Sequence, residues 1–206
     1  MLTIDSWGYV LHPSIRRAIR HGIEREPMPI VQGIIVHQTN SATASATLNG
    51  YTTPKANGAH FLIDKDGTIY QTASVFKQTW HVGKIKSLCY EKRTCPPVEM
   101  KLIAEYRRIR NPSKAASAEA RHERPKPPSD RYPSNSDSLG IELVGLAKEV
   151  GTDGKQVYEA VTPAQNDSLK WLVGQIEQTL NVQGHRVFRH PSASQKTETE
   201  ASTAEW

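Results

Sequence analysis

A short apolar run that ends in a histidine constrains the fold of this chain more than any other stretch. Residues 33–36 read Gly-Ile-Ile-Val, which predicts a buried strand, and His37 follows just before the chain turns polar at residues 40–43. A side chain at the end of such a strand is held rigidly and faces a rim of loops, where α/β proteins place functional groups. We therefore expect His37 to be a ligand, although a hydrogen-bonded structural histidine is the alternative for this stretch alone.

A second apolar run, near the other end of the sequence, also ends in a histidine. Residues 187–189 lead into His190, and the loop that follows supplies Lys196 and Glu198. Two imidazoles and one carboxylate form the ligand set of a catalytic zinc site, which leaves its fourth position to water. Together the two stretches predict a Zn²⁺ site built from His37, His190 and Glu198.

These residues resemble the zinc-dependent N-acetylmuramoyl-L-alanine amidases, a family that includes phage lysozyme-type amidases, anhydromuropeptide amidases and peptidoglycan recognition proteins. In that family a strand-end histidine opens the site, and a distant histidine is followed eight or ten residues later by Cys or Asp. His37, His190 and Glu198 match these places. The family usually has Cys-Pro-Gly or Asp-Pro-Gly at the third place, whereas residues 198–200 here are Glu-Thr-Glu, so Glu200 is a rival third ligand. His185 is a fallback for the second ligand, because it follows a glycine as in the recognition proteins.

Two further blocks resemble the family and point to substrate contacts. Residues 58–71 predict a β-hairpin that turns at Asp-Gly. Some family members have a catalytic tyrosine just before the position of His60, but this chain has Ala59, so that role must fall elsewhere. Trp80 and His81 precede a glycine and would form a wall for a sugar or a stem peptide. We expect His60, Trp80 and His81 to bind substrate; a packed tryptophan beside a loop histidine is the alternative for the second block.

A glutamate stands inside an apolar run at residues 139–144. An unpaired Glu142 among Ile and Leu would lose several kcal/mol on burial, so it needs a functional reason unless it lies on a solvated face of the strand. The resemblance implies that Glu142 is the catalytic base, because anhydromuropeptide amidases have a Gly-Ile-Glu-Leu strand with this role. It also implies that Lys196 stabilises the oxyanion.

The same blocks predict an α/β fold in which residues 1–206 form a single amidase-like domain with a mixed central β-sheet flanked by helices. The expected strands lie near residues 33–37, 60–64, 68–71, 139–144 and 186–189. Thr162 and Pro163 begin a clear amphipathic helix that runs to residue 180. Residues 1–32 form an N-terminal segment in which residues 13–20 carry a weak helical period, and a turn is expected at residues 153–155.

Residues 84–135 depart from the compact family pattern and read as a long insertion. A helix is expected over residues 98–110, followed by a Pro-, Ser- and charge-rich stretch that we expect to be partly disordered or draped over the surface. Cys89 and Cys95 lie in this insertion, and a disulfide and two free thiols are both compatible with their spacing.

The formal net charge of +5 suggests attraction to polyanions such as a carboxylate-bearing cell wall. We expect no nucleic-acid partner, because the basic insertion has few aromatics and no base-reading motif. No apolar run is long enough to span a membrane, and the first residues lack the features of a secretory signal. We therefore expect synthesis in the cytoplasm and action on the wall after non-Sec export, through type VI secretion or phage lysis, with cytosolic recycling as a third setting. An immunity or carrier protein would be a further partner.

The resemblance implies a zinc hydrolase that cuts the amide bond between N-acetylmuramic acid and L-alanine of the stem peptide, with peptidoglycan or a muropeptide as substrate. The alternative is a peptidoglycan-binding module without activity, because a glutamate replaces the usual third ligand. Zinc content discriminates between the two.

Overall fold

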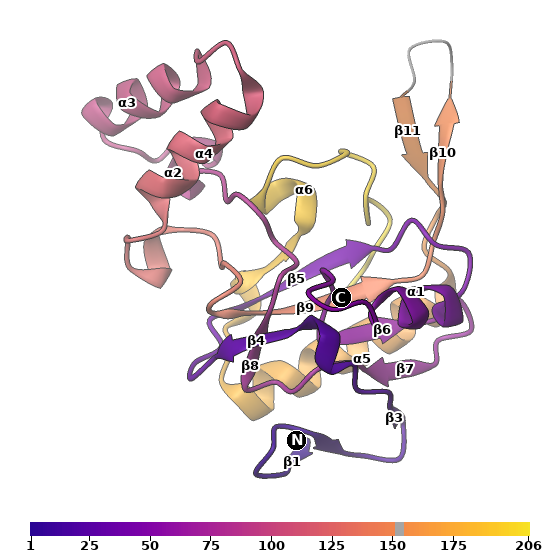
Figure 1. Cartoon of the computed structure of the whole chain (residues 1–206). Coiled ribbons are helices and arrows are strands. Elements are labelled where there is room, and N and C mark those ends of the chain that lie inside the picture. Colours follow the sequence, from indigo (N-terminus) through magenta and orange to yellow (C-terminus); the bar gives the residue numbers. More distant parts are fainter. Residues whose placement is uncertain (151–154) are drawn as a thin grey trace.

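The computed structural model describes residues 1–150 and 155–206, and its centre is a six-stranded sheet in the order β12-β5-β9-β6-β7-β3 (Figure 1). Strands β12, β5, β9 and β6 run parallel to one another. Strand β7 is antiparallel to β6, and β3 is parallel to β7. The mixed sheet that the sequence predicted is therefore confirmed. Its strands are β3 (Ile15–Arg17), β5 (Gly33–Gln38), β6 (Phe61–Ile63), β7 (Ile69–Gln71), β9 (Ser138–Leu143) and β12 (Val187–Arg189).

Side chains of the central strands alternate between the two faces of the sheet. Ile34 and Val36 of β5 join Ile141 of β9 in the main hydrophobic cluster, which also contains the buried face of helix α5 (Pro163–Leu180). His37 and Glu142 have the opposite parity and are register partners on adjacent strands. The pleat therefore places both polar side chains on the face away from α5.

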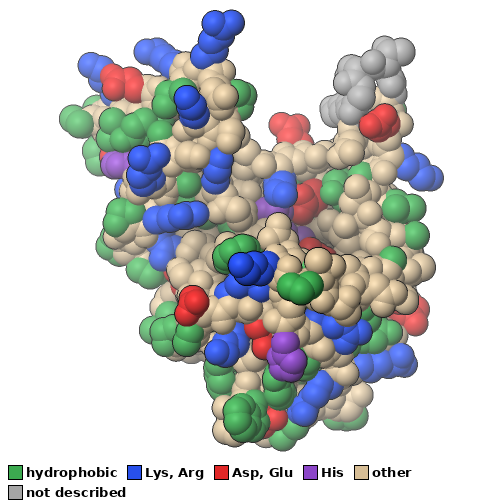
Figure 2. Space-filling model, in the orientation of Figure 1, with side chains coloured by type: hydrophobic (Ala, Val, Ile, Leu, Met, Phe, Trp, Pro, Cys, Tyr) green, Lys and Arg blue, Asp and Glu red, His purple; other side chains and the backbone are tan. Residues whose placement is uncertain are grey.

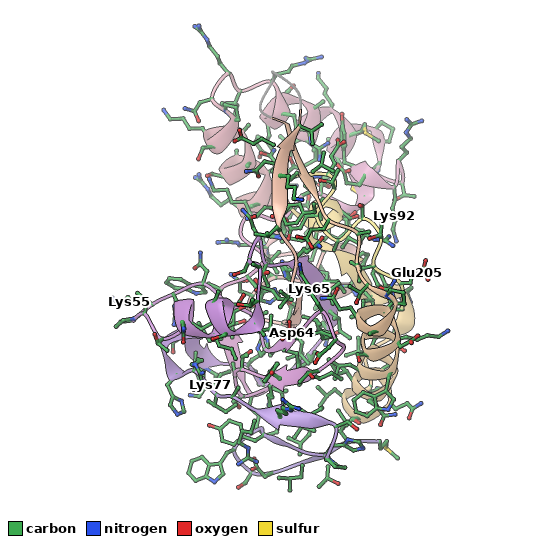
Figure 3. All side chains as sticks on the ribbon, turned by 90° about the vertical axis from the view of Figure 1, so that its right-hand side faces the viewer. Lys55, Asp64, Lys65, Lys77, Lys92 and Glu205 are labelled. Atoms are coloured by element: carbon green, nitrogen blue, oxygen red, sulfur yellow. A yellow bond between two sulfur atoms is a disulfide. The ribbon has the colours of Figure 1, made fainter. Side chains whose placement is uncertain are left out.

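Helix α5 covers one face of the sheet, as Figures 1 and 3 show from two directions. Thr162 caps it by accepting a hydrogen bond from the Gln165 N–H, and the Gln165 side chain accepts from the Thr162 N–H in return. Its fully buried Leu169 and Leu172 pack against the sheet. Burial of each such side chain stabilises the fold by about 1.5–3 kcal/mol.

The insertion is more ordered than its composition suggests. The helices are α2 (Leu88–Glu91), α3 (Pro97–Arg107) and α4 (Pro112–Glu123), followed by a 3₁₀ turn at Pro128–Asp130. The expected helix corresponds to α3, but α4 lies where we expected disorder. Asn111 caps α4 by accepting from the Lys114 N–H, and the helix is rich in alanine, the best helix former.

Ion pairs and a disulfide hold the insertion together. Arg107 of α3 donates to the buried carboxylate of Glu119 in α4, with Nη2 and Oε1 2.6 Å apart. Cys89 and Cys95 form a disulfide, which decides between the two alternatives left open by their spacing. A stretch with few large apolar residues thus folds through charge pairs, alanine packing and a covalent link.

The remaining elements are short. β1 (Thr3–Ile4) pairs with β2 (Val10–Leu11), β4 (Glu24–Pro27) with β8 (Lys77–Thr79), and β10 (Ala147–Val150) with β11 (Lys155–Tyr158); α1 (Ala44–Gly50) and 3₁₀ turns at His21–Ile23 and Gly184–Arg186 complete the fold. The weak helical period at residues 13–20 was misleading, because β3 lies there as an edge strand. The turn expected at residues 153–155 falls almost entirely on residues 151–154, outside the described part of the chain. Within the described residues, no helix combines the length and the hydropathy needed to cross a membrane.

Candidate active site

Three adjacent parallel strands bring polar side chains to one edge of the sheet. His37 lies near the end of β5, Glu142 lies opposite it on β9, and β12 leads directly into His190, the first residue of the short helix α6 (His190–Ala193). Because the carboxyl ends of parallel strands meet at one edge, these side chains gather there even though they are far apart in sequence.

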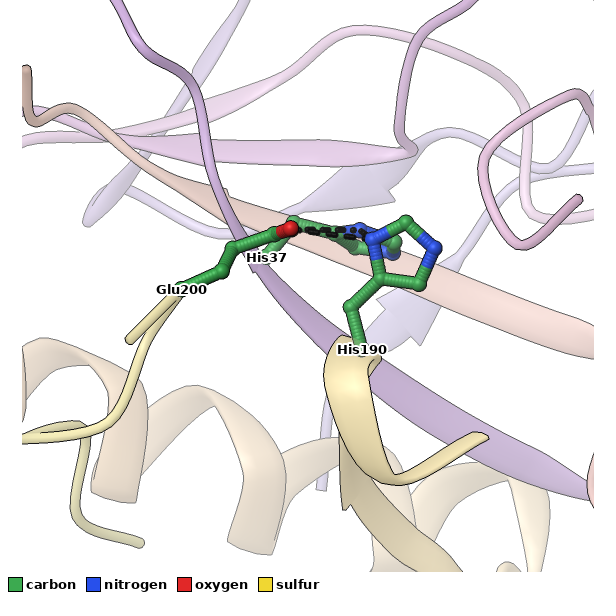
Figure 4. A group of neighbouring side chains, drawn as sticks. All are labelled: His37, His190 and Glu200. Atoms are coloured by element: carbon green, nitrogen blue, oxygen red, sulfur yellow. Dashed lines mark hydrogen bonds and ion pairs between the residues drawn. The ribbon is translucent and has the colours of Figure 1, made fainter. Parts of the chain in front are cut away.

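Glu200 reaches the same edge from the C-terminal segment (Figure 4). The next residue, Ala201, anchors this segment: its N–H donates to Gln38 Oε1 at 3.1 Å and its carbonyl accepts from Arg189 Nε at 3.0 Å. Glu200 Oε1 consequently lies 2.9 Å from His190 Nδ1 and 3.5 Å from His37 Nδ1. The two Nδ1 atoms are 2.8 Å apart.

The outer nitrogens of both histidines have partners that determine where the protons lie. His190 Nε2 is 3.0 Å from the Val82 carbonyl, which only accepts, so Nε2 carries the hydrogen. His37 Nε2 is 2.9 Å from His81 Nδ1, and His81 Nε2 is 3.3 Å from the Ser138 carbonyl. We assign the protons from this chain of partners, with His81 donating to Ser138 and His37 donating to His81. In the neutral rings, Nδ1 of His37 and Nδ1 of His190 then both present lone pairs.

The donor set therefore fits a zinc ion. Two imidazole lone pairs and a carboxylate oxygen converge, and in this protonation state no hydrogen lies between them. The three residues are only 2–5% exposed. Among the residues that the structure describes, the only basic groups within 4.0 Å of the Glu200 carboxylate are His37 and His190. A tetrahedral zinc site places its ligand atoms about 3.3 Å apart, close to the 2.8–3.5 Å separations found here.

Electrostatics favour the same protonation states. Burial, aided by His190, lowers the pKa of His37 to about 4. Burial alone would raise the pKa of Glu200. When an imidazolium hydrogen faces the carboxylate in place of a metal ion, hydrogen bonds and charge from His190 and His37 outweigh burial and lower that pKa to about 2. At neutral pH, His37 is thus a neutral ligand and Glu200 an ionised one.

His81 lies behind His37. Burial, and then the nearby His37, lower the pKa of His81 well below its ordinary value, so the ring stays neutral and can accept the His37 Nε2 hydrogen. Gly140 permits this approach, since a Cβ there would lie 2.8 Å from His81 Nδ1. A histidine in this place fixes the ring orientation and tautomer of His37.

Glu142 is held by a tyrosine from helix α1's C-terminal end. Tyr51 donates its hydroxyl hydrogen to Glu142 Oε2 at 2.6 Å and accepts from the Ala59 N–H at 3.3 Å. Burial raises the pKa of Glu142 above its ordinary value, the Tyr51 hydrogen bond opposes that rise, and the charge of Glu200 adds to it. A carboxylate with a raised pKa beside a candidate metal site is suited to proton transfer.

A cavity of about 580 Å³ is lined by His37, His81, Glu142, His190 and Glu200. Figure 2 shows a hollow between the insertion and the β10–β11 hairpin, with histidine and acidic side chains at its floor. Lys196, Trp80, Tyr158 and Arg124 also line the cavity. Burial, followed by the charges of Glu200 and Glu142, raises the pKa of Tyr158 to about 12, so its hydroxyl remains a donor.

The sequence matches the model of a known protein family. A family model described as N-acetylmuramoyl-L-alanine amidase matches residues 26–201, which is most of the chain and includes every residue of the cavity described above. The chain belongs to the N-acetylmuramoyl-L-alanine amidase family. It is therefore an enzyme of the amidase class. A separate search among curated protein sequences found no match.

Solved amidase structures share its fold. The crystal structure of a selenomethionine derivative of AmpD superposes with a TM-score of 0.56 at 18% identity, covering 99% of this chain and 95% of that one. AmpDh3 from Pseudomonas aeruginosa, solved in complex with anhydromuramic pentapeptide, gives 0.52 at 20% identity over 96% of this chain and 61% of that one. The catalytic domain of XlyA gives 0.50 at 17% identity, covering 88% and 87%. The chain thus spans under two thirds of AmpDh3 but nearly all of AmpD.

Within this amidase fold, the third residue beside the histidines is not the one preferred from sequence. Glu198 is exposed and lies outside the group, whereas Glu200 is buried in it, so the expectation of Glu198 is corrected to its rival. His185 is exposed in the 3₁₀ turn before β12 and is not part of the group, so the fallback is not needed.

The expected substrate contacts divide into three kinds. His60 is fully buried, and its Nε2 donates to the Lys77 carbonyl while its Nδ1 accepts from the Gly140 N–H, so it is a core residue and the expectation of a substrate contact was wrong. His81 lines the cavity, but both ring nitrogens face protein groups. Trp80 is 46% exposed on the cavity wall, with Arg25 over its ring at 4.5 Å. Only Trp80 retains a free surface for substrate.

Sequence reasoning missed Tyr51, Tyr158 and Arg124. The sequence assigns Tyr51 no role, and the signal that could have found it is the absence of a tyrosine at position 59, which is Ala59. The Tyr51 hydroxyl accepts a hydrogen bond from the Ala59 N–H. A tyrosine from the end of α1 thus places its phenol beside the position where some family members have a tyrosine and this chain has Ala59. Tyr158 and Arg124 lie in segments without a family pattern.

Proposed function

We propose that this amidase-family enzyme is a zinc hydrolase that cleaves the amide bond between N-acetylmuramic acid and L-alanine of the peptidoglycan stem. The observation that carries the proposal is the convergence of the His37 and His190 lone pairs and the Glu200 carboxylate in a buried site at the floor of the cavity. These three residues would hold the ion. When bound, zinc lowers the pKa of a coordinated water and polarises a carbonyl.

Glu142 would act as the general base. Tyr51 engages Oε2 and leaves Oε1 as the oxygen that accepts a proton from the attacking water. The water oxygen bonds to the carbonyl carbon, the C–N bond breaks, and Glu142 passes the proton to the departing alanine nitrogen. The products are a lactyl carboxylate on the sugar and a stem peptide with a free amino terminus.

Other cavity residues would bind and stabilise. Lys196 is exposed on the cavity wall and makes no ion pair within the described residues, so its ammonium is available to the oxyanion that develops in the transition state. Trp80 offers an aromatic face to a sugar or peptide. His81 would position His37 rather than contact the substrate.

The substrate class draws support from a neighbour. AmpDh3, which shares the fold, was solved with anhydromuramic pentapeptide, a muropeptide, and the cavity here, at about 580 Å³, lies in the size range of ligand sites. The alternative of a binding module without activity depended on an unsuitable third ligand. The placement of Glu200 beside both histidines supports the enzyme instead.

We also propose that the protein acts on the cell wall outside the reducing cytosol. The Cys89–Cys95 disulfide in the insertion supports this, because such bonds persist in oxidising compartments. An exported lytic enzyme, delivered by a secretion machine or released during phage lysis, fits this chemistry better than a cytosolic recycling enzyme. An immunity or carrier protein would then be an expected partner.

Digestion of purified peptidoglycan followed by mass spectrometry tests the reaction. We expect each cut to add one water and to release stem peptides that begin with a free L-alanine, and Glu142→Gln to release them at least about a hundredfold more slowly. Products in which the stem remains attached to muramic acid would overturn the proposed bond.

A further inference from the structure

The positive charge of the chain is concentrated in the insertion. Residues 84–135 contain 13 of the 26 Lys and Arg residues but only 6 of the 21 Asp and Glu residues, so the rest of the chain has a slight excess of acid. In Figure 2 the Lys and Arg side chains cluster on this projecting part of the molecule. A quarter of the sequence thus accounts for the basic character of the whole.

Two of the six acidic residues of the insertion are withdrawn from its surface. Glu119 and Glu123 are at most 1% exposed, and they pair with Arg107 and Lys126 respectively. The exposed arginines that remain, among them Arg108, Arg110, Arg121 and Arg124, form no ion pair with any described carboxylate. The solvent-facing surface of the insertion therefore carries a net positive charge that these arginines supply.

Two of these arginines line a cavity. Arg108 and Arg110 line a space of about 690 Å³ at the junction between the insertion and Gln195, together with Lys86, Arg107 and Glu91. Lys86 Nζ donates to the Pro191 carbonyl at 2.7 Å, and Arg107 pairs with Glu91 and Glu119. The guanidinium groups of Arg108 and Arg110 are therefore the lining cations without such a partner among the described residues. The pair offers planar donors suited to carboxylates.

This cationic cavity adjoins the active-site cavity. Gln195 lines the first and its neighbour Lys196 lines the second, so one short segment separates them. On another side, Arg124 at the end of α4 lines both the active-site cavity and a shallower one of about 300 Å³ that includes Trp80 and Ser136. Positive charge thus extends from the insertion to the rim of the catalytic groove.

We propose that the helical insertion is a second substrate-binding surface, in which Arg108 and Arg110 bind stem-peptide carboxylates of peptidoglycan beyond the stem that is being cut. This rests on the proposed function, because it takes peptidoglycan as the substrate. The polymer repeats its carboxylates along each strand, so a second contact raises the effective concentration of the first. Ile109, Pro112 and Ala115 line the cavity between the cations, and they offer no aromatic face on which a nucleic-acid base would stack.

Co-sedimentation with insoluble sacculi that have been stripped of phosphate polymers tests the proposal. The test variant is Arg108→Gln/Arg110→Gln, and the matched control is Arg16→Gln/Lys170→Gln, which removes the same charge from exposed residues outside the insertion. We expect the test variant to bind about tenfold more weakly at low salt and the control to bind as the wild type does. Both variants should hydrolyse a small soluble muropeptide at the wild-type rate, because the altered residues lie outside the catalytic cavity.

Two further arms separate the ligand from other polyanions. Amidation of the sacculus carboxylates should weaken wild-type binding as much as the double substitution does, and should remove the difference between variant and wild type. Equal binding by the test variant and the control would overturn the proposal, as would a defect confined to a phosphate polymer or to a DNA oligomer. Failure of the wild type to cleave muropeptides would instead overturn the proposed function, and the binding result would still stand by itself.

Discussion

Among the residues that the structure describes, two groups of histidine and carboxylate side chains have ligand atoms within 4.8 Å of one another, and the groups differ in what neutralises them. In the insertion, Glu99 accepts from His122 Nε2 at 2.8 Å, and the ammonium of Lys126 pairs with both Glu99 and Glu123. At the strand ends, no lysine or arginine within the described residues pairs with Glu200, and the histidine Nδ1 atoms face each other. The first group supplies its own cation, whereas the second has no lysine or arginine partner among the described residues and fits the zinc ion that we propose.

Proximity of ligand-type residues does not by itself identify a metal centre, because the positions of the hydrogens also matter. Lys126 brings donor hydrogens to the insertion group. In the other group, the Nε2 hydrogens of His37 and His190 point away from the carboxylate, toward His81 and the Val82 carbonyl. The same comparison separates structure from chemistry, because the group with its own cation joins α3 to α4 and the other lines the cavity.

The largest expected effect comes from removing one histidine from each group. His190→Ala should abolish stoichiometric zinc binding and lower amidase activity at least about a thousandfold, because it removes a ligand. His122→Ala, its counterpart in the insertion, should leave zinc content and activity near the wild-type values. Elemental analysis and muropeptide turnover measure both effects. Similar losses in the two variants would contradict the claim that only the strand-end group holds zinc.

Glu142→Gln should separate proton transfer from metal binding. The amide keeps the size of the side chain but cannot accept the proton of water, so we expect turnover to fall by a factor of about 10²–10⁴. Zinc stoichiometry should remain that of the wild type. A variant that loses zinc together with activity would place Glu142 among the ligands instead.

His81→Ala tests whether this residue positions His37 or binds substrate. Loss of the group that accepts the His37 Nε2 hydrogen should weaken zinc affinity by about 10–100-fold in a chelator competition. The KM measured with saturating zinc should change little. A raised KM with unchanged zinc affinity would restore the interpretation drawn from sequence.

Lys126→Met tests the self-neutralised group. The substitution leaves the fully buried Glu123 without its counter-ion, so we expect the free energy of unfolding to fall by about 2 kcal/mol, less than for a fully buried pair because Lys126 is 21% exposed. Lys114→Met is the matched control, because Lys114 lies in α4 of the same insertion but is exposed and forms no ion pair with a described residue. Denaturant unfolding measures both, and equal stability of the two variants would contradict the assignment.

Tyr51→Phe should have the smallest effect, seen mainly in the pH profile. The Tyr51 hydrogen bond opposes the burial that raises the pKa of Glu142, so its loss should raise this pKa further. A base must be ionised to act, and the acidic limb of the rate profile should therefore move to higher pH. An acidic limb that stays in place or moves to lower pH would show that Tyr51 does not control Glu142.

Local patterns predicted the parts of the site that lie on regular strands. Apolar runs marked β5 and β9, and the family resemblance assigned His37 and Glu142 to the site. The parallel register of the two strands, which the sequence does not state, places both side chains on one face. The family spacing from His190 allowed either eight or ten residues to the third ligand, and sequence alone favoured Glu198. The contacts of Ala201 with Gln38 and Arg189 select Glu200, and these depend on the folded sheet rather than on the loop sequence.

The sequence was less informative where tertiary contacts decide the outcome. Low hydrophobic content suggested disorder at residues 112–123, but alanine propensity and the Arg107–Glu119 pair stabilise α4. His60 has the same parity as Leu62, on the side of the sheet away from α5, yet its hydrogen bonds to Lys77 and Gly140 make it a core residue. Tyr51 contacts Glu142 across 91 positions of sequence, a distance over which no local pattern operates.

Zinc stoichiometry of Glu200→Ala, compared with Glu198→Ala, tests the central claim most directly. The two glutamates are two residues apart in one segment, and only the first lies beside the histidines. We predict one zinc per chain in the wild type and in Glu198→Ala, and loss of that zinc with loss of activity in Glu200→Ala. Retention of zinc in Glu200→Ala, with its loss in Glu198→Ala, would contradict the site described here.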